Sequence, residues 1–78
     1  MLYRCDMDDL ATNLRRANAH HAGLLRTGDK RAICQAYIAA LEAERALLLD
    51  CGGDADREAA EAIGYQIEDE RAALARLA

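Results

Sequence analysis

The sequence lacks several residue types that small proteins commonly use. Its 78 residues contain no proline, phenylalanine, tryptophan, valine or serine, and three tyrosines and two histidines supply the only aromatic rings. Because the large aliphatic side chains are only eleven leucines, four isoleucines and two methionines, eighteen alanines must fill much of the interior. Such a small core leaves little surplus stability, so burial against a partner, including a homodimer, would stabilise the fold.

The absences also argue against catalysis. Without serine there is no serine nucleophile, and the sequence has neither a glycine-rich phosphate loop nor paired carboxylates beside an expected pocket. A nucleophilic pair of Cys34 and His21 is conceivable, but both residues belong to predicted core-facing seams that substrate would not reach. We therefore expect a protein that is not an enzyme, with no catalytic residues and no cofactor.

Long apolar runs are missing as well. The first twelve residues have no apolar core of a signal peptide, and no window approaches the roughly 20 apolar residues of a membrane span. Cys5, Cys34 and Cys51 are odd in number and include no close C-x-x-C pair, which is typical of reduced thiols. These features predict a soluble cytoplasmic protein without a membrane partner.

Charge is plentiful but mostly acidic. Fourteen acids outweigh ten bases to give a net charge of −4, which argues against a protein that coats phosphate backbones. Nine of the bases are arginine, and together with the eighteen alanines they are typical of a GC-rich bacterial or phage coding sequence.

Two glycine-containing breaks divide the chain into three helices. At Thr27-Gly28-Asp29, the glycine suits a left-handed position and the aspartate can cap the next helix. A second break spans 50–54, with Asp54 as the expected cap. Helices are predicted over about 6–26, with a start near Leu2 as the alternative, and over 29–50 and 54–77. Short connections between helices of matched length predict one all-α domain over 1–78, an antiparallel up-down-up three-helix bundle.

Apolar spacing supports this arrangement. Alternating steps of four and three run through the first segment as Tyr3, Met7, Leu10, Leu14, Ala17, His21 and Leu24, and through the third as Asp56, Ala60, Ile63, Ile67, Glu70, Leu74 and Leu77. The middle segment has two faces, one around Ile38 and Leu41 and one of alanines, so it should be central. Gly64 in the third helix costs about 1 kcal/mol relative to alanine, which suggests a close helix crossing.

Antiparallel folding places three polar seam residues, His21, Cys34 and Glu70, at one level. We expect a polar core layer in which His21 bonds Glu70 and Cys34 packs as a small apolar residue, with no metal. The alternative is a metal- or redox-responsive bundle, because imidazole, thiolate and carboxylate are ligands for zinc and similar ions.

The same folding separates the charges. Acids gather at one end, namely Asp6, Asp8, Asp9, Asp50, Asp54, Asp56 and Glu58, and bases gather towards the other, namely Arg26, Lys30, Arg31, Arg71 and Arg76. Helix dipoles favour much of this polarity, but Asp50 at a C-terminus and Lys30 with Arg31 at an N-terminus oppose it. A nucleic-acid-associated regulator acting through the basic end is therefore a further alternative, against which the acidic total counts.

Tyr65 points away from the third helix's seam, among carboxylates at neighbouring helical positions. An outward aromatic residue offers contact area at low entropy cost, although isolated exposed aromatics are also ordinary. We predict a small acidic protein–protein interaction module, a non-catalytic inhibitor or adaptor of a larger protein or complex. One example is a phage or mobile-element inhibitor of a host defence nuclease. The expected partner-binding residues are Tyr65, Glu61, Glu68, Asp69, Asp50 and Asp54.

Overall fold

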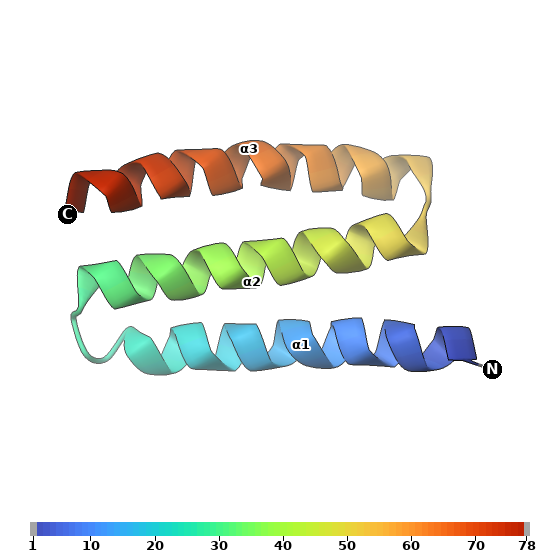
Figure 1. Cartoon of the computed structure of the whole chain (residues 1–78), viewed down its shortest axis with the longest axis horizontal. Coiled ribbons are helices and arrows are strands. Elements are labelled where there is room, and N and C mark those ends of the chain that lie inside the picture. The colour runs from blue at the N-terminus through green and yellow to red at the C-terminus, as the bar shows by residue number, and fades with distance from the viewer. Residues whose placement is uncertain (1, 78) are drawn as a thin grey trace.

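The computed structural model describes the backbone of residues 2–77 and the side chains of residues 9–77. Its three helices are α1 (Leu2–Leu24), α2 (Lys30–Cys51) and α3 (Asp54–Leu77), which run alternately up and down (Figure 1). The prediction of an antiparallel three-helix bundle is confirmed. The first helix, however, starts earlier and ends two residues sooner than the expected 6–26.

The three helices lie side by side in one layer, with α2 in the middle (Figure 1). Within the described chain, α2 packs against both neighbours, whereas α1 and α3 do not pack against each other. The molecule is accordingly thin, with extents of 43 × 23 × 15 Å. The central place of α2 agrees with its two apolar faces, and the layer leaves two broad surfaces open.

The first chain reversal uses the residues expected to end one helix and start another. Gly28 adopts a positive φ of 72°, and the Asp29 side chain accepts a hydrogen bond from the amide of Ala32 at 3.2 Å. The Thr27 hydroxyl donates to the carbonyl of Leu24 and accepts from the amide of Asp29. These bonds satisfy backbone groups at both helix ends and fix the turn.

The second reversal differs by one residue from the expectation. Gly52 takes the left-handed conformation, with φ 78°, and its amide donates to the carbonyl of Leu48, which ends α2. The carbonyl of Gly53 accepts from the amide of Arg57 at 2.9 Å, so α3 already includes Asp54. Asp54 is thus the first helical residue rather than the preceding cap, and there its negative charge complements the helix dipole.

The apolar core lies between α2 and α3. It consists of Cys34, Ile38 and Leu41 from α2 with Ile63 and Ile67 from α3, and partly buried apolar side chains pack around it. These positions recur at spacings of three and four, so they form one stripe on each helix. Burial of these side chains supplies the main favourable contribution to helix pairing.

The contact between α1 and α2 is shallower. Ala36 and Ala40 of α2 are buried on the side away from Ile38, where their small side chains let α1 approach. Among the described side chains of α1, none is buried, and its seam residues Leu10, Leu14 and Leu24 are half-buried. None of the described helices combines the length and the apolar character that a membrane span requires.

Candidate functional site

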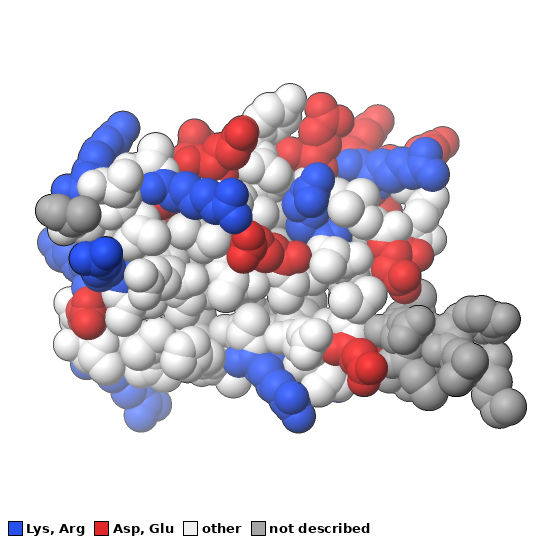
Figure 2. Space-filling model, viewed as in Figure 1, with Lys and Arg blue, Asp and Glu red and all other residues white. Residues whose placement is uncertain are grey.

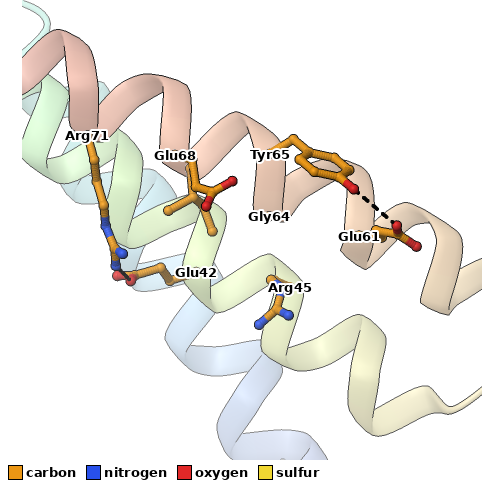
Figure 3. A pocket seen from close by; sticks show the side chains of 8 residues that line it. Glu42, Arg45, Glu61, Gly64, Tyr65, Glu68 and Arg71 are labelled. Atoms are coloured by element: carbon orange, nitrogen blue, oxygen red, sulfur yellow. Dashed lines mark hydrogen bonds and ion pairs between the residues drawn. The ribbon is translucent and has the colours of Figure 1, made fainter.

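An open groove of about 500 Å³ lies between α2 and α3 on one broad surface of the layer (Figure 3). We call it the Tyr65 groove. Charged side chains from both helices surround a small apolar floor. The lining residues are Glu42 and Arg45 of α2 with Glu61, Gly64, Tyr65, Ile67, Glu68 and Arg71 of α3.

Tyr65 is the most prominent side chain of the groove. It is 62% exposed, the largest value among the large hydrophobic side chains that the structure describes as exposed. Its hydroxyl donates a 3.3 Å hydrogen bond to the carboxylate of Glu61, one turn earlier on α3 (Figure 3). The ring is therefore held along its own helix with much of its surface in water.

Gly64 keeps the groove open. A Cβ placed on it would come within 4 Å of one heavy atom only, the Nε of Arg45 at 3.5 Å, which is an ordinary contact with a flexible side chain. The expectation that Gly64 permits a close helix crossing is therefore wrong, because no neighbouring backbone occupies that space. The missing side chain leaves a gap between Tyr65 and Arg45 instead (Figure 3).

The groove contains one ion pair and one arginine that has no ion-pair partner among the described side chains. Arg71 donates to Glu42 at 2.6 Å, although both side chains remain about half exposed, at 60% and 49%. Arg45 makes no hydrogen bond or ion pair with the side chains that the structure describes. Its guanidinium and the carboxylates of Glu61 and Glu68 can therefore engage an external group.

The structure brings together part of the predicted partner-binding set. Tyr65, Glu61 and Glu68 line the groove, whereas Asp69 is exposed on α3 outside it. Asp50 and Asp54 are exposed beside the turn between α2 and α3, at the acidic end of the layer. Sequence reasoning missed other residues that line the groove. Glu42 and Arg45 come from α2, and Ile67 and Arg71 come from α3.

His21, Cys34 and Glu70 border one hollow, but they do not form the expected buried polar layer, because no polar or charged side chain among the described residues is buried. Their contacts also differ from the expectation. The Cys34 thiol donates to the backbone carbonyl of Glu70 at 3.4 Å and lies 3.7 Å from its carboxylate. The expected hydrogen bond between His21 and Glu70 is absent from the described residues. The His21 ring packs instead beside Tyr37, with centroids 5.3 Å apart. Tyr37 belongs to α2, which packs against α1, whereas Glu70 belongs to α3, which makes no such contact among the described residues.

Cys34 is the one buried member of this level, while His21 and Glu70 are half-buried. Burial raises the pKa of the Cys34 thiol above its ordinary 9.0, and the negative charge of Glu70 and the hydrogen bond to that residue raise it further. The thiol is therefore protonated at neutral pH. A thiolate would be needed for metal ligation or nucleophilic attack.

The same residues line a second hollow of about 320 Å³. We call it the Cys34 hollow; it is bordered by His21, Lys30, Ile33, Cys34, Tyr37 and Glu70. Across the described part of the chain, no group of three or more histidine, cysteine, aspartate or glutamate side chains is arranged to hold a metal ion.

Charges are separated along the layer. Lysine and arginine gather at the end where α1 and α3 finish, and acidic side chains are more frequent along α3 towards the other end (Figure 2). Asp9, Asp50, Asp54 and Glu58 are exposed in the acidic half. The side chains of Asp6 and Asp8, which were assigned to that end, lie outside the described residues.

The chain was compared with known protein families, with curated proteins and with solved structures, and none of the three comparisons found a match. The Tyr65 groove and the Cys34 hollow are therefore characterised by their own residues alone.

Proposed function

We propose that the chain is a non-catalytic interaction module, an inhibitor or adaptor that binds a larger protein through the Tyr65 groove. The observation that carries the proposal is the 62% exposed ring of Tyr65 beside Gly64, whose missing side chain leaves a depression bordered by Arg45. Interface energy concentrates most often in tryptophan, tyrosine and arginine side chains, and this groove offers both Tyr65 and Arg45.

The charges of the groove suggest the chemistry of its partner. Glu61 and Glu68 lie on the α3 side, and Arg45, which has no ion pair among the described side chains, lies on the α2 side of Gly64. A complementary segment would place an apolar side chain over Gly64 and Ile67 and a basic side chain near the α3 carboxylates. An acidic group of the same segment would reach Arg45, because a guanidinium binds carboxylates well.

The other two hypotheses gain no comparable support. A metal- or redox-responsive bundle needs a reactive thiolate, whereas the pKa of Cys34 is raised. A nucleic-acid regulator would use Arg26, Lys30 and Arg31, which are exposed at the basic end, but the net charge of −4 counts against binding to a phosphate backbone.

Affinity capture from the native host tests the proposal. Tyr65→Ala should abolish capture of a stoichiometric partner, and Gly64→Leu should do the same by filling the depression while improving helix propensity. Asn13→Ala, an exposed change on α1 outside the groove, is the matched control and should capture normally. A partner retained by both groove variants would contradict the assignment of this surface.

A further inference from the structure

The broad surface opposite the Tyr65 groove carries a stripe along α2, formed by Ile33, Tyr37, Glu44 and Leu48. We call it the α2 stripe. Tyr37 and the groove residue Glu42 lie roughly 140° apart around α2 at 3.6 residues per turn, so these two side chains belong to opposite surfaces of the layer. Ile33, Tyr37 and Leu48 are half-buried, so a single layer of helices covers them incompletely.

We propose that the α2 stripe is the contact surface for a second copy of this chain, packed face to face and antiparallel. The stripe matches itself in that orientation. Antiparallel pairing about the centre of α2 (Lys30–Cys51) sets Ile33 opposite Leu48 of the partner subunit and Tyr37 opposite Glu44 of the partner subunit. The single acid of the stripe therefore meets a hydroxyl rather than an apolar side chain.

The hydrogen-bonding state of Tyr37 supports this pairing. Its hydroxyl accepts a 3.1 Å bond from the Gln66 amide, which leaves its own proton available. Glu44 is exposed and has no hydrogen bond or ion pair among the described residues. A bond from the tyrosine hydroxyl to the partner's carboxylate would satisfy both groups at a partly desolvated interface.

Shape supports the same register. The Cys34 hollow borders Ile33 and Tyr37, and its volume of about 320 Å³ exceeds that of one leucine side chain. In the antiparallel arrangement Leu48 of the partner subunit faces Ile33 and projects into this hollow. The geometry is the knob-into-hole packing that joins helices elsewhere.

Charge and size also favour a second copy as the occupant. Antiparallel stacking sets the basic end, with Lys30, above the acidic end of the partner subunit, whereas a parallel stack would set like charges together. The layer extends 43 by 23 Å, so one broad surface has room for a standard interface of roughly 800 Å² per partner. The site goes beyond the proposed function, because it leaves the Tyr65 groove free.

A charge-exchange series tests both the dimer and its register. We expect sedimentation equilibrium of the wild type, at concentrations up to about 1 mM, to give the mass of two chains. Ile33→Lys or Leu48→Glu alone should raise the dissociation constant on the order of tenfold or more, because each places an unpaired charge in the interface. The double variant should regain the dimer by pairing the two new charges across the interface. Within one chain these positions are roughly 22 Å apart along α2 and cannot pair.

Tyr65→Lys, on the opposite surface, is the matched control and should leave the mass unchanged. Circular dichroism establishes that each variant keeps its helices. The proposal would be overturned if the wild type were monomeric. It would also be overturned if the double variant stayed monomeric while folded, or if Tyr65→Lys abolished the dimer. If none of the stripe variants changed the mass of a dimeric protein, the contact would lie on another surface, and the proposal would again be overturned.

A second measurement uses the unaltered protein and so does not depend on variant folding. Lys30 is the sole lysine, and roughly 30 Å of helix separates it from Asp50 of its own chain. Zero-length carbodiimide coupling should join Lys30 to Asp50 or Asp54 of the partner subunit in a species of two chains, mapped by peptide mass spectrometry. The antiparallel arrangement would be overturned if no cross-link formed between chains, or if the cross-links between chains did not include these pairs.

Partner capture separates this proposal from the proposed function. Normal capture by a monomeric Ile33→Lys variant would show that the Tyr65 groove works independently of the dimer.

Discussion

The thiol of Cys34 on α2 donates a hydrogen bond to the backbone carbonyl of Glu70 on α3, with sulfur and oxygen 3.4 Å apart. The two residues are 36 positions apart in sequence. Their contact joins the two helices that share the core, and it also places the thiol where a neighbouring carboxylate opposes its ionisation.

This contact predicts a specific pH dependence of stability. The folded state raises the pKa of Cys34, so folding favours the protonated thiol. The contribution is therefore fully present below the ordinary thiol pKa of 9.0 and is lost as pH rises from there through the folded-state pKa. Urea melts from pH 7 to 10.5 should show a steeper alkaline loss of unfolding free energy in the wild type than in Cys34→Ala. Cys51→Ala, which changes an exposed thiol, should retain the wild-type slope; parallel slopes for wild type and Cys34→Ala would refute the prediction.

Two glycines should respond in opposite directions to alanine. Gly64→Ala should raise the unfolding free energy by about 1 kcal/mol, since a Cβ there meets only the Arg45 side chain at 3.5 Å. Gly28→Ala should lower it by roughly 1–2 kcal/mol, because φ is +72° although no atom lies within 4 Å. Chemical denaturation of both variants measures the difference. A destabilised Gly64→Ala protein would mean that α2 and α3 approach more closely than the structure shows.

The core between α2 and α3 should dominate stability. Ile67→Ala should lower the unfolding free energy by about 2–4 kcal/mol, because the side chain is 6% exposed and its removal leaves a cavity. Leu49→Ala is the matched control, since Leu49 is 46% exposed and should cost within about 0.5 kcal/mol. Thermal melts of the two variants provide the comparison, and equal losses would place the core elsewhere.

The ion pair across the Tyr65 groove should contribute little to stability. Arg71 and Glu42 are 2.6 Å apart, but their side chains are 60% and 49% exposed. A double-mutant cycle with Arg71→Ala and Glu42→Ala should give a coupling energy of about 0.2–1 kcal/mol that decreases with added salt. A larger coupling energy that does not change with added salt would show that the pair is shielded from solvent.

Much of the fold could be predicted from local sequence patterns. The spacing of Ile63 and Ile67 and the two faces of α2 define which sides of the helices pack, and Gly28 with Asp29 marks the first turn. The site was less accessible. Tyr65 could be recognised as exposed, but Arg45 joins it only because α2 and α3 meet at a particular register, and the effect of Gly64 depends on what lies opposite it.

The sequence by itself therefore determined the number of helices, their approximate limits and the amphipathic faces, because these follow from turn residues and from periodicity within a few turns. Only the tertiary structure decided that the helices form one layer, that Cys34 rather than His21 bonds Glu70, and that a groove opens at Gly64. The physical reason is that helix register and azimuth depend on packing between side chains far apart in sequence, which local spacing does not specify.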